Sequence, residues 1–89
     1  MKKRVFHFYA DPGHGWLKVP FRLLKQLGIE SLITSCSYVY GSFVYLEEDC
    51  DAATFINALR ESAIPYEFRV HTSNKRSRIR SYDLYEATP

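Results

Sequence analysis

The stretch that decides the fold is "SYVYGSFVYL", residues 37–46, in which two alternating runs of β-forming residues flank Gly41-Ser42. A Gly-Ser pair between two such runs is typical of a two-residue hairpin turn. The register of this turn pairs Tyr40 with Phe43, Val39 with Val44 and Tyr38 with Tyr45. Because side chains alternate along a strand, the hairpin has an aromatic and an aliphatic face. The aromatic face consists of Tyr38, Tyr40, Phe43 and Tyr45, and the aliphatic face of Val39, Val44 and Leu46.

Two helices are expected to cover the aliphatic face. The first begins at Pro20, which can occupy the first turn of a helix, and ends at Gly28, which we expect to be a left-handed cap. The second begins with Asp49 or Asp51 as its N-cap and ends before Pro65. Its apolar residues follow helical spacing. They are Ala52, Phe55, Ile56, Leu59 and Ala63.

Further strands are expected around these elements. Residues 4–10 are rich in β-forming residues, residues 16–19 resume an extended path, residues 66–71 alternate in polarity, and residues 79–85 return as a last strand. The order β-α-β-β-α-β-β predicts an α+β fold, with a mostly antiparallel sheet and two helices packed on one face. Since no linker or repeat divides the sequence, residues 1–89 are expected to form a single domain.

Size and composition limit the classes of function. A chain of 89 residues buries only about 60 to 65% of its extended surface, so we expect no deep pocket and no cofactor. The formal net charge of +2 is too small to indicate nucleic acid by itself, and no apolar run approaches the roughly 20 residues of a membrane span. Cys36 and Cys50 form no CxxC and follow no signal peptide, which favours free thiols in a reduced cytoplasm.

The loop "DPGHGW", residues 11–16, indicates either a turn or a binding site. Pro12 and Gly13 suit the middle of a type II turn, in which glycine takes a positive φ and Asp11 bonds the amides of the turn. His14 and Trp16 are not explained by turning alone. Trp16 is either a core residue or, with Asp11 and His14, a contact for a partner. No metal is expected, because the histidines and cysteines lack the spacing of a zinc site.

The aromatic face of the hairpin is the strongest candidate for a binding surface. Helices on the aliphatic side cannot reach it, and tyrosine suits both water and a partner. We expect Tyr38, Tyr40 and Tyr45 to be partly accessible and to contact a partner, with Glu47 and Glu48 at the polar rim. Two alternatives stay open. Either the first strand and the opening loop cover the face, so that the tryptophan completes a second small core, or the face binds a second copy of the chain.

The segment "NKRSRIRSY" carries the alternative site. In nucleic-acid-binding proteins, cations contact phosphates and a tyrosine stacks on a base. Such a module would use Lys75, Arg76, Arg78, Arg80 and Tyr82. The same charges on a solvated hairpin tip would only protect an edge strand from aggregation.

Three stretches resemble small accessory proteins of bacteriophages and prophages: "DPGHGWLKVP", "LLKQLGI" and "VYLEEDCDAATF". The resemblance covers most of the chain and implies a phage protein in the cytoplasm of a bacterial host. It carries over no functional residue. It also implies a mode of action, because small phage proteins of this kind often act by stoichiometric binding and include inhibitors of CRISPR and other host defences.

The sequence therefore predicts a small non-enzymatic binding protein. It is expected to act stoichiometrically on a host macromolecule, foremost a protein or protein complex, as an inhibitor of a defence such as CRISPR. A nucleic-acid-binding module is the alternative from another class. An enzyme that uses Asp11 and His14 comes third, because the sequence contains no recognisable catalytic set. No membrane is expected as a partner, and a homodimer stays open.

Overall fold

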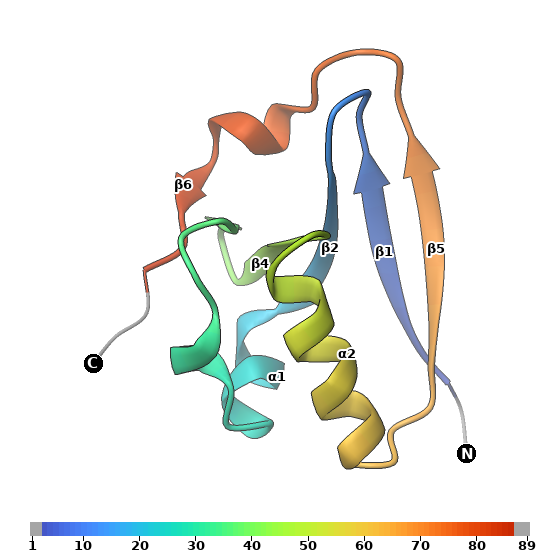
Figure 1. Cartoon of the computed structure of the whole chain (residues 1–89), viewed down its shortest axis with the longest axis vertical. Coiled ribbons are helices and arrows are strands. Elements are labelled where there is room, and N and C mark those ends of the chain that lie inside the picture. The colour runs from blue at the N-terminus through green and yellow to red at the C-terminus, as the bar shows by residue number, and fades with distance from the viewer. Residues whose placement is uncertain (1–2, 87–89) are drawn as a thin grey trace.

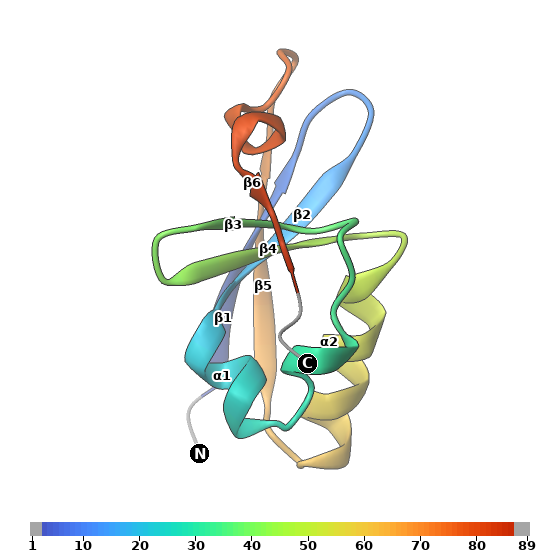
Figure 2. The ribbon, with the colours of Figure 1, turned by 90° about the vertical axis from the view of Figure 1, so that its left-hand side faces the viewer.

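A computed structural model describes residues 3–86, in which six strands form one twisted sheet (Figures 1 and 2). The strands are β1 (Arg4–Ala10), β2 (Gly15–Pro20), β3 (Tyr38–Tyr40), β4 (Phe43–Glu47), β5 (Tyr66–Thr72) and β6 (Asp83–Leu84). Their order across the sheet is β5-β1-β2-β4-β3-β6. Neighbouring strands are antiparallel except β1 and β5, which run parallel. The prediction of an α+β fold with a mostly antiparallel sheet is confirmed.

The hairpin of β3 and β4 has the register that its turn predicts. The paired residues are Tyr38 with Tyr45, Val39 with Val44 and Tyr40 with Phe43. Gly41 has a φ of 61°, a left-handed conformation that glycine adopts without steric cost. The four rings therefore share one face of the sheet, as expected.

The first helix, α1 (Phe21–Gln26), follows Pro20 and ends in a glycine cap. Gly28 has a φ of 72°, as predicted for a left-handed cap. Its amide donates to the carbonyl of Lys25, and the amide of Ile29 donates to that of Leu24, both at 3.0 Å. These two bonds form a Schellman motif, which satisfies carbonyls that the helix end leaves free. A 3₁₀ turn, η1 (Glu30–Leu32), follows.

The second helix, α2 (Asp51–Glu61), begins differently from the prediction. Cys50 occupies the N-cap and makes no side-chain capping bond, so the expectation that Asp49 or Asp51 caps the helix is wrong. Asp51 is instead the first helical residue. Its buried carboxylate accepts bonds from the Thr34 amide at 3.1 Å and from the Ser37 hydroxyl at 2.5 Å. This carboxylate therefore fastens the segment before β3 to the start of α2, where a negative charge also suits the helix dipole.

Both helices pack on the aliphatic face of the sheet and form the larger core. Phe55 of α2 contacts Phe6 of β1 edge to face, with ring centroids 5.1 Å apart. The same cluster contains Leu17 and Val19 from β2, Val44 and Leu46 from β4, Leu23 and Leu24 from α1, and Leu59 from α2. Since these β2 and β4 side chains alternate with the rings on the other face, one sheet separates two different environments.

The segment after β5 differs most from its prediction. Residues 79–85 were expected to form a strand, but Arg78–Ser81 form a 3₁₀ turn, η2, and only Asp83 and Leu84 pair as β6. The Ser77 side chain accepts a bond from the Ile79 amide at 3.2 Å and so caps the turn. Both views place η2 beside the β1–β2 loop at one end of the molecule (Figures 1 and 2).

Through this turn, the aromatic face acquires a second small core. Trp16, Tyr45 and Ile79 are buried, with exposed fractions of 2%, 6% and 4%. Tyr9, Tyr38 and Tyr82 pack around them and are half-buried. The second small core with Trp16 is thus realised, but the expectation that the first strand and the opening loop cover the face is wrong, because both flank the face as parts of the sheet and η2 supplies the cover. The expectation that Tyr45 is accessible is wrong, because Ile79 and Tyr82 of this segment cover its ring.

We predict that Trp16→Ala lowers the free energy of unfolding by about 3 to 5 kcal/mol, because it removes the largest side chain of the second core. Denaturant unfolding followed by circular dichroism measures this loss. Tyr40→Ala is the matched control, since Tyr40 is 62% exposed and its loss is expected to cost less than about 1 kcal/mol. Equal losses for the two variants would contradict the role of Trp16 in the core.

Candidate functional site

The candidate site is the face of the sheet opposite the helices, here called the helix-free face. The strand registers assign to it the side chains that share a face with Trp16 and Tyr45. These are Val5, His7 and Tyr9 on β1, Trp16, Lys18 and Pro20 on β2, Tyr38 and Tyr40 on β3, Phe43, Tyr45 and Glu47 on β4, Glu67, Arg69 and His71 on β5, and Leu84 on β6. The face is therefore rich in aromatic rings, and η2 crosses only part of it.

An ion pair between Asp11 and Arg80 attaches η2 to the β1–β2 loop. The Asp11 carboxylate accepts bonds from Arg80 Nε at 2.7 Å and from Arg80 Nη2 at 2.8 Å. The exposed fraction of the Asp11 side chain is 1% and that of Arg80 is 26%. Arg80, together with the amides of Ser77, His14 and Gly13, holds the pKa of the Asp11 carboxyl well below its usual value, against the opposing effect of burial.

The same carboxylate organises the loop, although the turn type differs from the prediction. Asp11 Oδ1 accepts bonds from the amides of Gly13 and His14, each at 3.0 Å, as the sequence predicted. Gly13 does not have a positive φ, so the predicted type II turn is wrong. Gly13 has another reason to lack a side chain, because a Cβ there would lie 2.9 Å from Arg80 Nη2.

Arg80 also contacts the second core. Its guanidinium carbon lies 5.3 Å from the ring centroid of Trp16, within the range of a cation–π contact. Of the residues in the alternative site, Arg80 is therefore bound by Asp11 and Trp16. Tyr82 is half-buried, whereas Lys75, Arg76 and Arg78 are exposed. The predicted basic cluster therefore contains one cation with a structural role, Arg80, and three that face solvent.

The predicted partner-contact residues are likewise divided. Asp11, Trp16 and Tyr45 are buried, Tyr38 and Glu47 are half-buried, and His14, Tyr40 and Glu48 are exposed. Trp16 and Tyr45 thus belong to the second core, beneath the exposed residues of this face. Accessibility is confirmed for Tyr38 and Tyr40, and their contact with a partner stays a prediction.

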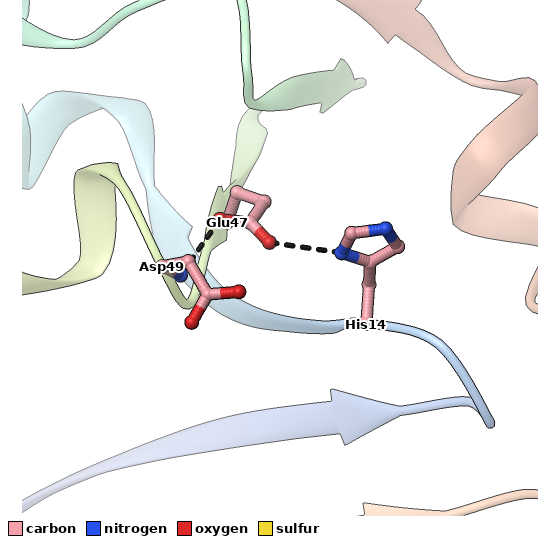
Figure 3. Close-up of side chains that lie close together, drawn as sticks. All are labelled: His14, Glu47 and Asp49. Carbon is pink, nitrogen blue, oxygen red and sulfur yellow. Dashed lines mark hydrogen bonds and ion pairs between the residues drawn. The ribbon is translucent and has the colours of Figure 1, made fainter.

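His14, Glu47 and Asp49 come together at the loop end of the helix-free face (Figure 3). His14 Nδ1 lies 3.1 Å from Glu47 Oε1, and Glu47 Oε2 accepts a bond from the Asp49 amide at 2.7 Å. One nitrogen and two carboxylate groups lie within 4.8 Å of one another, so these residues have the donor types that a divalent cation binds. Glu47 also contacts both of the others, through the His14 ring and the Asp49 backbone amide, and so joins the β1–β2 loop to the turn before α2. Sequence spacing gave no indication of this group, because the pairing of β2 with β4 brings its members together.

A patch of exposed apolar side chains lies at the other part of the face, and we call it the β3–β4 patch. It consists of Tyr40, Phe43 and Leu84, with exposed fractions of 62%, 36% and 54%. Tyr82 stacks on Tyr40 with ring centroids 4.5 Å apart and an interplanar angle of 13°. The amine of Lys18 lies 4.3 Å from the ring centroid of Phe43. Each exposed ring is therefore held by a neighbour on one side and free on the other.

A stack of His7, Tyr9 and His71 is a feature that the sequence did not predict. Tyr9 lies opposite His71 across the parallel pair of β1 and β5, with ring centroids 4.8 Å apart and an interplanar angle of 17°. His7 Nδ1 lies 2.9 Å from His71 Nε2. Only the parallel pairing of strands distant in sequence creates this stack, so no local signal could have indicated it.

Comparisons with known proteins give no family: no protein-family model matches the chain, and no curated protein or solved structure matches it. Within residues 3–86, no helix has the length and apolar character needed to cross a membrane. Cys36 is exposed, Cys50 is half-buried, and both are free thiols.

We predict that Asp11→Asn lowers the melting temperature at neutral pH by more than about 5 °C. Because the folded chain holds the pKa of this carboxyl below the ordinary value of 3.8, its stabilising effect is complete above that value and is lost as the pH falls through the folded pKa. The difference between the wild type and the variant should therefore narrow in acid. Thermal melts from about pH 7 to about pH 2 measure this.

Glu67→Gln is the control, because the pair of Glu67 with Arg69 is exposed and its atoms are 3.7 Å apart. Such surface pairs contribute little to stability, so this variant should melt close to the wild type at every pH. A constant difference between Asp11→Asn and the wild type down to the lowest pH would contradict the proposed role of the ionised carboxylate.

Proposed function

We propose that this chain is a small non-enzymatic binding protein that acts stoichiometrically on a partner protein through its helix-free face. The observation that carries this proposal is the β3–β4 patch. Its side chains are exposed, whereas Val44 and Leu46 on the opposite face of the same hairpin are buried under the helices. Apolar side chains that cluster at the surface, away from the core, usually mark an interaction surface.

The residue types of the patch favour a protein partner. Aromatic residues are enriched at protein interfaces and supply many of the residues that dominate binding energy. Tyr40 is already stacked on Tyr82, and Phe43 has Lys18 above its ring, so both rings are partly ordered before binding. Ordering beforehand reduces the conformational entropy that association costs.

The geometry does not favour the catalytic pair considered from the sequence. Asp11 accepts a bond from the backbone amide of His14, while the imidazole of His14 faces Glu47 instead. Both oxygens of Asp11 are also bonded to Arg80. Asp11 therefore does not orient the His14 ring as the acid of a catalytic dyad would.

The biological context of the proposal comes from the sequence resemblance alone. Origin in a bacteriophage or prophage, action in the cytoplasm of a bacterial host, and inhibition of a defence such as CRISPR all stay predictions of that resemblance. They fit a protein that acts by occupying a surface of its target. The proposal itself depends on the β3–β4 patch and holds for any protein target.

A nucleic-acid-binding module is the second candidate, favoured by one observation. Lys75, Arg76 and Arg78 are exposed, and none of them makes an ion pair with another residue of the part that the structure describes. Free cations next to tyrosine rings are suited to phosphates and bases. In this mode the cations, and not the β3–β4 patch, would dominate affinity.

We predict that the double variant Tyr40→Ser/Phe43→Ser loses its protein partner. Immobilised wild-type chain should retain a protein from bacterial lysate in a saturable, stoichiometric ratio. The variant should bind that same protein more weakly by about 2 kcal/mol or more, as expected for interface rings, because it loses two apolar contacts. Titration of the isolated partner by calorimetry gives the affinity.

Val70→Ser is the matched control, because Val70 is 63% exposed but lies on the other face of β5. It should bind the partner like the wild type. Unchanged affinity of the double variant, with its melting temperature retained, would contradict the proposal. Loss of concentration-dependent dimerisation in sedimentation would identify a second copy of the chain as the occupant instead. Steeply salt-dependent binding of single-stranded oligonucleotides, lost on Arg76→Ala, would favour the second candidate.

A further inference from the structure

A cavity of about 310 Å³ lies on the helix-free face beside η2, and the β3–β4 patch does not explain it. Arg78 and Tyr82, which belong to the second candidate function, are among its lining residues. Its walls combine three phenol rings with two cations. The lining residues are Tyr9, Lys18, Tyr45, Ser77, Arg78, Ile79 and Tyr82. Both the sheet and η2 contribute to these walls, and the bonds of Asp11 with Arg80 help to hold η2 in place.

The charged side chains that line the cavity are all cationic. No acidic side chain lines it. Within residues 3–86, neither Lys18 nor Arg78 forms an ion pair with a carboxylate. Arg80, by contrast, is neutralised by Asp11. Two unpaired cations beside one small cavity complement an anion, and Arg78 in particular can bind a phosphate through two parallel hydrogen bonds.

The phenols give the cavity its second property. Burial, with contributions from the neighbouring Tyr82 and Tyr9, raises the pKa of Tyr45 to about 12. The Tyr45 ring therefore forms the buried, uncharged floor of the cavity. Tyr9 and Tyr82 are only half-buried, so their rings offer partly accessible surfaces for stacking.

We propose that this cavity binds a nucleotide, whose base packs against the tyrosine rings and whose phosphate is held by Lys18 and Arg78. The volume is at the lower end of the roughly 300 to 1,000 Å³ of small-molecule sites, which suits one such unit. The base of a nucleotide is a flat aromatic ring that suits the tyrosine rings, and its phosphate is an anion that suits the two cations. The site uses other residues than the β3–β4 patch, so it does not depend on the proposed protein partner.

The nucleotide has two sources, free in solution or within a single strand. A second cavity of about 280 Å³ shares Lys18 with the first and is also lined by Arg4, His7 and Phe43. Lys18 thus lies where two neighbouring units of a strand would place the phosphate that joins them. A free nucleotide would need only the first cavity. Affinity for a mononucleotide and for a short single strand therefore separates the two sources.

Adenosine monophosphate is the first probe, with adenosine and inorganic phosphate as its two halves. Trp16 reports binding through its fluorescence, because it is the only tryptophan of the chain and packs in the cluster of Tyr9, Tyr45 and Tyr82. We expect saturable binding of the monophosphate, with an affinity higher than that of either half. Ring signals of Tyr9 and Tyr82 should shift in carbon-labelled protein, while those of Tyr66, which is on the other face, should not.

Variants of the two cations have close controls in the same chain. Arg78→Ala and Lys18→Met should each weaken binding about tenfold or more, as expected for the loss of a charge-assisted hydrogen bond. Arg76→Ala and Lys75→Met remove exposed cations that do not line the cavity, and their affinities should match the wild type. Circular dichroism melts check that all four variants are folded.

The second probe is a short single-stranded oligoadenylate. Tighter binding than the monophosphate, with affinity falling steeply as salt increases, assigns the site to a strand; equal affinity assigns it to a free nucleotide. Three results would each overturn the proposal. They are no saturation by either probe, inorganic phosphate binding as tightly as the monophosphate, or equal losses for Arg78→Ala and Arg76→Ala. The tyrosine signals test the wild type directly, so a variant that unfolds does not leave the proposal undecided.

Discussion

The ion pair of Asp11 with Arg80 is the interaction on which the two-sided packing of this sheet depends. Asp11 accepts five hydrogen bonds, three from the amides of Gly13, His14 and Ser77 and two from the guanidinium. One carboxylate therefore shapes the β1–β2 loop and anchors η2 at the same time. Because the Asp11 side chain is almost fully buried, removal of Arg80 would leave a buried carboxylate without its ion-pair partner. The shape of the β1–β2 loop and the cover of the aromatic face thus depend on the same carboxylate.

The two faces of the sheet meet different physical requirements. The helix side is sealed by aliphatic and phenylalanine side chains, which gain stability simply by leaving water. The other side is closed by Trp16 and by tyrosine rings, whose hydroxyls tolerate partial exposure. The second core is therefore continuous with the exposed tyrosines at the surface of this face. A domain of 89 residues in this way obtains both a core and a candidate binding face from the same few strands.

Local sequence signals predicted the parts of the fold that depend on neighbouring residues. The hairpin register followed from Gly41, and the end of α1 followed from Gly28. The predictions were wrong where contacts between segments distant in the sequence determine the local structure. Asp51 does not cap α2 because Thr34 and Ser37 occupy its carboxylate, and residues 78–81 leave the extended path where Ser77 and Asp11 hold them. The group of His14, Glu47 and Asp49 and the stack of His7 on His71 need strand pairings that no spacing along the chain encodes. The aromatic face of the hairpin could thus be predicted from the sequence. The cover that η2 provides and the cavity beside η2 could not.

The position of Arg80 in the chain has a consequence for synthesis on the ribosome. The strands β1 to β5 and both helices precede it, so the cover of the aromatic face leaves the ribosome after the strands that it covers. During that interval Trp16 and Tyr45 have no Ile79 beside them, and the nascent chain exposes a surface rich in tyrosine. Proteins whose stabilising contacts join distant segments fold more slowly and expose such surfaces longer. The second core therefore cannot be complete until the segment around Arg80 has been synthesised.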